Sequence, residues 1–560
     1  MTGRTGPSNW PASWRYPAHA AAVTATRGMI ATTDRYASQV GAGVLEAGGN
    51  AVDAAVATSF ALAVVNPEAG NVGGGGFLVL RTADGTVAAH DHRTTAPAGA
   101  TREMYLDEHG AVTEESVIGH RSVAVPGTVR GLWDAHRRFG SRPWAELLGP
   151  AIDLAGGFVV TERCIHSYGR DVVSGLRRFP PSARVFLPGG ALPSRGDVFR
   201  QPELAATLER IRDRGADGFY RGETADLIVA EMKRHGGLLT HADLAGYRSV
   251  WRQPVRTRYR GYEVLSMSPP SSGGVALAQI CGMLEGYAVR DMEWHGAAHV
   301  HLMAETWRRA YADRNHYLTD PDFVDMPLDV LLDSAYATWH GRDLSLERAT
   351  PSADIAPGME AYRRESEHTT HLSVVDPFGG AVSLTTTINS WYGSRVVVDG
   401  AGVVLNNDMD DFTAKPGMAN QFGLVQGKAN AIAPGKRMLS AMTPTIVLGS
   451  DGGLFLVIGT PGGSSIITTV FQVLSNLVDH GMGLAQAVLA PRVHHQHLPD
   501  QISYEPGGLP DEVMETLRAM GHRLAARDEL AGDVEAIRRR PDGTLEGIAD
   551  PRRGGTAIGC

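Results

Sequence analysis

A threonine-rich stretch two-thirds of the way along the chain constrains the structure more than any other feature. Residues 369–389 read TTHLSVVDPFGGAVSLTTTIN, which is two strand-like runs around a short turn. Antiparallel pairing centred on Phe378 predicts a three-residue loop closed by Asp376 and Gly380. Gly379 then takes the left-handed conformation that such loops favour. The stretch therefore predicts a tight β-hairpin with a defined register.

That register determines which side chains share a face. Thr369 lies opposite Thr387, and directly opposed residues have Cβ atoms roughly 5 Å apart on the same side. Asn389 follows on that side by the two-residue period of a strand. The preceding segment, residues 343–368, is polar, weakly patterned and interrupted by proline, so we expect it to be exposed and mobile. Thr369 is thus expected at the mouth of a polar-faced hairpin.

Two interpretations fit this pattern. The threonines could serve only as good strand formers in an amphipathic hairpin. Alternatively, the chain could cut itself before Thr369, because an N-terminal threonine has its own general base, the free α-amine. The unperturbed pKa of that amine, roughly 8, leaves a useful neutral fraction near pH 7. The pattern alone leaves both interpretations open.

Composition excludes several classes of partner. The net charge of the 560 residues is −9 and no run of basic residues offsets it, which argues against a nucleic-acid partner. Three scattered cysteines are too few for a disulfide framework or a zinc site. The most apolar segment, AVDAAVATSFALAVV, is too short and too polar to span a bilayer, and the start of the sequence shows no export signal. We expect a cytoplasmic protein without a membrane partner.

Glycines mark two further features. Residues 38–67 predict two helices separated at Gly48 and Gly49, the second ending before Pro67. The run NVGGGGF stands directly before a buried strand. A phosphate loop is disfavoured because the Gly-Lys-Ser/Thr signature is missing, and close backbone packing is the preferred explanation.

Other motifs invite rival functions. HHQH (residues 494–497) suggests a metal, but no carboxylate or cysteine in the motif completes a site. HVHLMAETW (residues 299–307) suggests the same, although a helix start with an exposed i,i+4 pair explains it as well. A serine hydrolase built on Ser464 or Ser465 is disfavoured because GTPGGSS is not a nucleophile elbow. An inactive scaffold would be indicated by loss of Thr369 or of the glycine pair, and both are present.

At this point the sequence resembles the γ-glutamyltransferase (glutathione hydrolase) family of N-terminal-nucleophile hydrolases. The resemblance covers nearly the whole chain, and its motifs occur in the family's order. They are GGNAVDAAVA, NVGGGGF, DHRTTAPAGATREMY, AVPGTVRGL, PPSSGG, TTHLSVVD, LNNDMDDF, TPGGSS and PRVHHQH.

The resemblance implies an αββα sandwich of two intertwined chains, made when the precursor cuts itself. It places the cut at the His368–Thr369 bond, with Thr369 as nucleophile and Thr387 as its supporting partner. Gly462 and Gly463 would form the oxyanion hole, a role that backbone donors suit because they are fixed before charge develops.

The same resemblance divides the chain. Residues 1–368 would form a large subunit and residues 369–560 a small subunit, which associate after the cut. Residues 415–439, rich in Gly, Pro and Asn, correspond to a lid over the pocket. No cofactor and no metal are implied, and the partner is a small molecule.

Five residues fall where the family holds an amino-acid group. Arg93 and Ser440 are placed at the α-carboxylate, Arg93 through a charge-assisted pair. Asn389, Asp408 and Asp411 are placed at the α-ammonium. The implied substrate is therefore a γ-glutamyl or related amino-acid acyl compound.

Three positions depart from the family pattern. Ala441 stands where a second serine usually follows Ser440, so one donor to the carboxylate is missing. Thr94 replaces the acidic residue often found after the arginine, and Asp408 stands where Gln or Glu is usual. Two enzyme classes therefore compete: a conventional γ-glutamyl hydrolase or transferase, and a recruited biosynthetic enzyme. Relatives of the second kind hydrolyse a C–C bond in alkylproline formation for antibiotics, or hydrolyse acyl amides.

Overall fold

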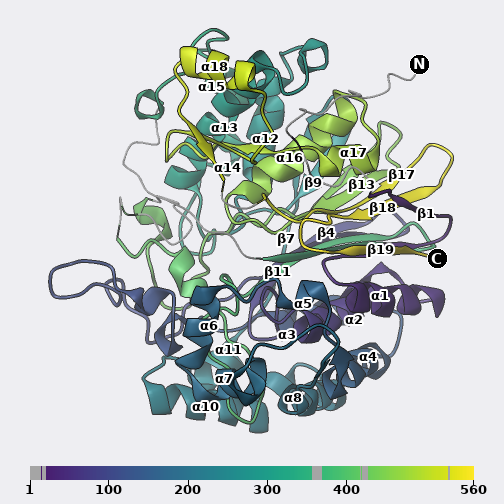
Figure 1. Cartoon of the computed structure of the whole chain (residues 1–560), viewed down its shortest axis with the longest axis vertical. Coiled ribbons are helices and arrows are strands. Elements are labelled where there is room, and N and C mark those ends of the chain that lie inside the picture. The colour runs from purple at the N-terminus through teal and green to yellow at the C-terminus, as the bar shows by residue number, and fades with distance from the viewer. Residues whose placement is uncertain (1–13, 15–19, 356–368, 416–417, 419–426, 528–529) are drawn as a thin grey trace.

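Two sheets lie face to face in the middle of the molecule, and helices cover the outer face of each (Figure 1). The computed structural model describes residues 14, 20–355, 369–415, 418, 427–527 and 530–560. Within these residues each sheet has seven strands. In spatial order, the first sheet contains β19 (Thr556–Gly559), β2 (Met29–Thr32), β10 (Thr370–Val375), β11 (Ala381–Thr387), β3 (Gly75–Arg81), β4 (Val87–His92) and β7 (Val250–Arg252). The second contains β1 (Val23–Ala25), β18 (Leu545–Ala549), β17 (Glu535–Arg539), β13 (Leu454–Gly459), β12 (Thr445–Leu448), β9 (Tyr262–Ser266) and β8 (Val255–Tyr259).

The two helical layers lie on opposite sides of this pair of sheets (Figure 1). On the first sheet lie α1 (Arg35–Glu46) and α2 (Ala51–Val65), backed by α4 (Trp144–Gly156) and α8 (Pro202–Arg214). On the second lie α12 (Gly273–Leu284), α13 (Ala297–Tyr317), α16 (Ser465–Val478) and α17 (Leu484–Leu489). This is the expected αββα sandwich.

The predicted hairpin is confirmed. β10 and β11 pair antiparallel with Thr370 opposite Thr386 and Val375 opposite Ala381, the predicted register. The amide of Asp376 donates to the carbonyl of Gly380 at 2.9 Å.

The loop residue Gly379 has φ of 90°, in the left-handed region that glycine enters without steric cost. The residues of the loop were therefore sufficient to predict the register in which β10 and β11 pair.

The polar stripe of the hairpin faces the other sheet. Leu372 and Leu384 pack under α1 and α2, while the alternating residues point between the sheets. There His371 Nδ1 lies 2.8 Å from Thr385 Oγ1, and Ser383 donates to the carbonyl of Ile458 on β13 at 3.0 Å. Because buried polar groups require partners, this stripe joins the two sheets through hydrogen bonds rather than through apolar contact alone.

Both sheets mix strands from before and after Thr369. In the first sheet β10 and β11 lie between β2 and β3, and in the second β12 pairs with both β9 and β13. A cut before Thr369 would thus leave two chains that share both sheets.

The helix and glycine predictions for the N-terminal region are confirmed. α1 ends at Glu46 and α2 begins at Ala51, where Asn50 and Asp53 form a capping box. The glycine run packs closely against backbone. A Cβ on Gly74 would lie 2.0 Å from the carbonyl oxygen of Thr387, so a side chain there would displace the second strand of the hairpin.

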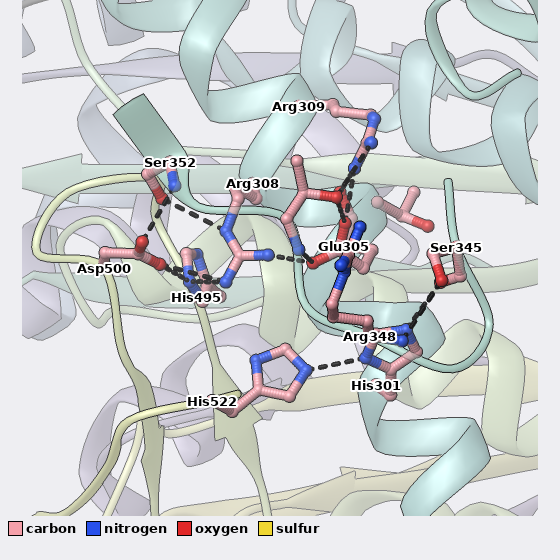
Figure 2. Close-up of polar contacts among 12 residues, drawn as sticks. His301, Glu305, Arg308, Arg309, Ser345, Arg348, Ser352, His495, Asp500 and His522 are labelled. Atoms are coloured by element: carbon pink, nitrogen blue, oxygen red, sulfur yellow. Dashed lines mark hydrogen bonds and ion pairs between the residues drawn. The ribbon is translucent and has the colours of Figure 1, made fainter. Parts of the chain in front are cut away.

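The described part of the segment before the hairpin, residues 343–355, agrees with its predicted exposure at most positions and departs from it at Ser352. Residues 356–368 lie outside the described residues, but Ser352 is buried rather than exposed. Its amide donates to Asp500 at 2.8 Å, and its hydroxyl accepts from Arg308 Nε at 3.1 Å (Figure 2). Ser352 is therefore a buried, hydrogen-bonded position in a stretch whose described residues are otherwise largely exposed or half-buried. Among the described helices, none combines the length and the apolar character that crossing a membrane would require.

Candidate active site

The hydroxyl groups of Thr369 and Thr387 meet at the mouth of the hairpin, with 3.3 Å between their Oγ1 atoms. The amide of Asn389 donates to Thr387 Oγ1 at 2.9 Å, which orients that hydroxyl. Arg553 Nη1 donates to the carbonyl oxygen of Thr369 at 3.4 Å. Thr369 therefore has a supporting hydroxyl on one side and a cation at its carbonyl. His368, the other residue of the predicted cleavage site, lies outside the described residues.

Gly462 and Gly463 form the turn between β13 and α16. Their φ angles are 137° and 53°, values that a residue with a Cβ rarely adopts, so the turn requires glycine. The carbonyl of Gly462 accepts from the hydroxyl of Ser465 at 2.8 Å. Neither glycine amide donates to a carbonyl or side chain among the described residues. These amides stand at the N-terminus of a fourteen-residue helix, whose dipole favours negative charge.

A pocket opens where the hairpin, this turn and the 439–442 segment meet. Six of the predicted site residues line it: Thr369, Thr387, Asn389, Asp411, Ser440 and Gly463. Also in the wall are Arg314, Leu439, Ala441, Met442, Ser464 and Ile466.

Arg93 lies behind the pocket wall in a buried ion-pair network. Its Nη1 is 3.0 Å from Asp408 Oδ2, and its Nη2 pairs with Asp411. The hydroxyl of Thr94 donates to the same Asp408 oxygen at 2.6 Å. Tyr247 fixes the backbone by donating to the Arg93 carbonyl at 2.8 Å. The predicted carboxylate-binding arginine is thus held by the two predicted ammonium-binding carboxylates.

The electrostatics of this network centre on Asp411. Burial raises the pKa of Asp411 to about 7, Arg93 opposes that rise, and the charges of Asp408 and Asp410 add to it. Burial also raises the pKa of Asp408, against the lowering effects of Arg93 and of the Thr94 hydroxyl. The pocket therefore contains a carboxyl group that changes charge near neutral pH.

Ser440 and Ala441 belong to the same set of pocket wall residues as Asp411. The Ser440 carbonyl accepts from the amide and the hydroxyl of Ser272, at 2.8 and 2.7 Å, which fixes the backbone there. The Ser440 hydroxyl accepts from the amide of Met442 at 3.2 Å. Ala441 is itself one of the residues that line the pocket.

The predicted lid is partly described. Residues 416–417 and 419–426 of the 415–439 stretch lie outside the described residues. Its later part, residues 427–439, is described and makes hydrogen bonds near the pocket. The side-chain amide of Asn430 donates to the carbonyl of Asp411 at 2.7 Å and accepts from the amide of Leu439 at 3.0 Å. The end of this stretch is therefore tied directly to the pocket wall.

Sequence reasoning missed Arg314. It projects from the buried helix α13 into the pocket, and its Nε donates to Ser272 Oγ at 3.0 Å. Because α13 carries several arginines, charge alone could not indicate which of them reaches the site. The only available signal was helical spacing, which does not define a face when a helix is buried on all sides.

The interpretation of residues 299–305 as an exposed pair is wrong. His299, His301 and Glu305 are all buried, because α13 packs between α12 and the C-terminal elements β14 (Val493–His494) and α18 (Asp511–Ala519). Glu305 pairs with both Arg308 and Arg309 (Figure 2). The helix start itself, at Ala297, was predicted correctly.

The HHQH motif is also buried and hydrogen-bonded. His494 Nδ1 lies 2.8 Å from Thr468 Oγ1, and the ring of His497 contacts the carbonyl of Ser352. A carboxylate does reach the motif, contrary to expectation: Asp500 lies 3.3 Å from His495 Nε2. That carboxylate also pairs with a cation, Arg308, at 3.0 Å. The histidines of the motif therefore join neighbouring segments of the chain through buried hydrogen bonds.

The αββα layers and the threonine at the hairpin mouth define an N-terminal-nucleophile hydrolase. The family model described as gamma-glutamyltranspeptidase matches residues 37–560. The chain belongs to that family, and it is an enzyme of the γ-glutamyltransferase and glutathione hydrolase type.

Three similar proteins illustrate the range of the family. A glutathione hydrolase proenzyme of Pseudomonas aeruginosa is 48% identical over 544 residues, covering 96% of this chain and 95% of that protein. The acylase ACY 1 proenzyme of Pseudomonas sp. strain SE83 is 39% identical, covering 95% and 93%. The crystal structure of cephalosporin acylase from Bacillus halodurans has a TM-score of 0.83 at 29% identity, covering 98% and 99%.

Proposed function

We propose that the chain matures by self-cleavage and then transfers γ-glutamyl groups from amides to water or to an amine. The observation that carries this proposal is the meeting of Thr369, Thr387 and Gly463 in one pocket. A nucleophile, a supporting hydroxyl and a backbone donor at one point are what acyl transfer requires.

Maturation begins with the Thr369 hydroxyl. Its oxygen attacks the carbonyl carbon of His368, and the peptide nitrogen leaves, so the amide becomes an ester on Thr369. Water hydrolyses the ester, which releases the carboxyl group of His368 and restores the hydroxyl. The product is a large chain ending at residue 368 and a small chain that begins with a free α-amine.

The mature site then repeats this chemistry on substrate. The α-amine of Thr369 takes the hydroxyl proton as the oxygen attacks the γ-carbonyl carbon. The amides of Gly462 and Gly463 would stabilise the resulting oxyanion, an effect worth about 2.7–4 kcal/mol per donor in comparable sites. The protonated amine next gives its proton to the leaving nitrogen. Water or an acceptor amine attacks the acyl ester and regenerates Thr369.

We assign recognition of the substrate's amino-acid group to the pocket residues and the buried network behind them. Asp411 and Asn389 line the pocket and would accept hydrogen bonds from the α-ammonium, while Ser440 would donate to the α-carboxylate. Arg93 pairs with Asp411 in this structure, so a bound carboxylate would have to draw that guanidinium away from it. Self-cleavage does not use this end of the pocket and should not depend on it.

A second candidate substrate is favoured by Ala441. An alanine in the pocket wall leaves the substrate carboxylate one donor short, a difference of about 1.5–3 kcal/mol for a charged acceptor. At 1.4 kcal/mol per factor of ten, this corresponds to about ten- to a hundredfold in affinity. Acyl amides with a different acid end, including those of a biosynthetic pathway or an acylase, would lose less.

The test compares wild-type enzyme and Ala441→Ser on γ-glutamyl anilide and on 4-aminobutyryl anilide, which keeps the amino group but lacks the α-carboxylate. For the proposed function, wild type turns over the γ-glutamyl compound, and Ala441→Ser lowers its KM by about tenfold or more. Ser440→Ala is the matched control and should raise the KM. Preference for 4-aminobutyryl anilide by wild type would indicate the alternative with a different acid end, and turnover of neither would contradict both.

A further inference from the structure

A cluster of two histidines and one glutamate lies away from the pocket, in the helical layer beside the first sheet. His120 comes from the turn η2 (His120–Ser122), and Glu231 and His235 come from α10 (Glu223–His235). His120 Nε2 is 2.9 Å from Glu231 Oε1, and His235 Nε2 is 3.5 Å from the same oxygen. All three ligand atoms lie within 4.8 Å of one another.

These separations suit a tetrahedral metal ion. Zinc binds imidazole nitrogen and carboxylate oxygen at roughly 2.1 Å, so two ligands of one ion lie roughly 3.4 Å apart. The distances from Glu231 Oε1 to the two histidine nitrogens, 2.9 and 3.5 Å, lie on either side of that separation. Glu231 and His235 are four residues apart on one helix, which places both on the same face. The imidazole rings of His120 and His235 are stacked with centroids 4.6 Å apart, so both ring edges approach Glu231 together.

The cluster also has an entrance and a supporting contact. The side chain of His235 is 52% exposed, while those of His120 and Glu231 are 5% and 4% exposed. An ion could therefore enter from solvent and keep a water as its fourth ligand. The second oxygen of Glu231 pairs with Arg234 at 2.7 Å, which leaves Oε1 for the metal. Hydrogen bonds to the second oxygen of a ligating carboxylate are a usual feature of metal sites.

A second group with similar residues lacks these properties. His301, Glu305 and His522 also come close together, but all three are buried (Figure 2). Both oxygens of Glu305 are taken up by Arg308 and Arg309, and a divalent cation would have to displace those charges. His301 and His522 bond to each other at 2.7 Å. The side chains of this second group are therefore paired with other protein groups and support the packing of the helical layer.

We propose that His120, Glu231 and His235 bind one zinc ion with a water as fourth ligand. The ion would tie α10 to the chain segment that follows η2. That segment supports the pocket: the amide of Ala124 donates to Asn406 Oδ1, which also accepts from the amide of Asp408. The site is structural, since it lies outside the catalytic pocket and needs no exchange of ligands during turnover.

The experiment uses the full-length, tag-free protein after treatment with a chelator. Equilibrium dialysis against zinc chloride, followed by elemental analysis, should give one ion per chain. Cobalt(II) in place of zinc should give the visible absorption of a four-coordinate site. Zinc should also raise the Tm, because a ligand that binds only the folded state stabilises it.

The diagnostic variant is His235→Ala, which removes an exposed side chain and leaves the His120–Glu231 contact in place. It should weaken zinc binding at least tenfold and abolish the Tm rise. His241→Ala is the matched control, because His241 is exposed and pairs with a single carboxylate, Asp226. That variant should bind zinc as wild type does. Equal zinc affinity in the two variants, or no stoichiometric zinc in wild type, would overturn the proposal.

Discussion

Thr94 Oγ1 donates a hydrogen bond to Asp408 Oδ2 at 2.6 Å, and the same oxygen lies 3.0 Å from Arg93 Nη1. Thr94 and Asp408 are two of the positions that depart from the pattern of the family. Their contact joins these two positions, because the Thr94 hydroxyl and the Arg93 guanidinium share one oxygen of Asp408.

This link predicts coupling between the two residues. Thr94→Val removes a donor from a buried carboxylate and should reduce kcat/KM on γ-glutamyl anilide by about ten- to a hundredfold, since such a bond contributes about 1.5–3 kcal/mol. Asp408→Asn should reduce it as well. The double variant should lose less than the sum of the two effects, with a coupling of about 1 kcal/mol or more. Strictly additive losses in this double-mutant cycle would show that the contact has no functional role.

The supporting role of Thr387 gives a second prediction. Thr387→Ala removes the hydroxyl 3.3 Å from Thr369 Oγ1 and should reduce kcat by at least about tenfold in processed enzyme, while Thr387→Ser should retain most of it. Thr386→Ala is the control, because the Thr386 hydroxyl points away and donates to the carbonyl of Gly75. Steady-state assays that measure kcat for the three variants test this prediction. A kcat loss in Thr386→Ala as large as in Thr387→Ala would point to hairpin damage instead.

The charge of Asp411 predicts a pH dependence of substrate binding. With its pKa raised to about 7 by burial, Asp411 is neutral below that pH and ionised above it. Only the ionised form attracts an α-ammonium, so the KM for γ-glutamyl anilide should fall as the pH rises through about 7. Asp411→Asn should have a high KM with no such fall. If wild type and Asp411→Asn have parallel pH profiles of KM, Asp411 does not recognise the substrate's ammonium.

Removal of Arg93 is a less informative experiment. Its guanidinium is fully buried against two carboxylates, and breaking a buried pair costs about 3–5 kcal/mol because a charge is left uncompensated. We therefore expect Arg93→Ala to lower the Tm markedly, with loss of activity following from instability. A Tm equal to that of wild type would mean that the network is less dehydrated than its burial indicates.

The features that the sequence predicted well depend on neighbouring residues. The hairpin register follows from Pro, Phe and Gly in one short loop, and the break between α1 and α2 follows from Gly48 and Gly49 with the Asn50 cap. Each of these rests on the conformational preferences of a few consecutive residues. The layered fold required the family resemblance, because strands as distant as β2 and β10 pair in it.

The features that were missed depend on contacts distant in the sequence. Ser352 was predicted to be exposed because its neighbours are polar, yet Arg308 and Asp500 bury it. The pairing of Arg93 with Asp408 and Asp411, which lie more than three hundred residues away, was not predicted, and its role at a substrate carboxylate stays a prediction. A polar residue has no local signal that distinguishes a solvated position from a paired and buried one. Such pairs become visible only when the chain is folded.

The central claim is that Thr369 becomes the N-terminal nucleophile, and intact-mass analysis of the purified protein tests it most directly. Wild type should give two species, residues 1–368 and 369–560, and N-terminal sequencing of the smaller should begin with Thr-Thr-His. Thr369→Ala should remain one uncut and inactive chain, whereas Thr370→Ala should be cut at the same bond. A wild-type protein that is fully active as one uncut chain, or a Thr369→Ala variant that is cut and active, would contradict the claim.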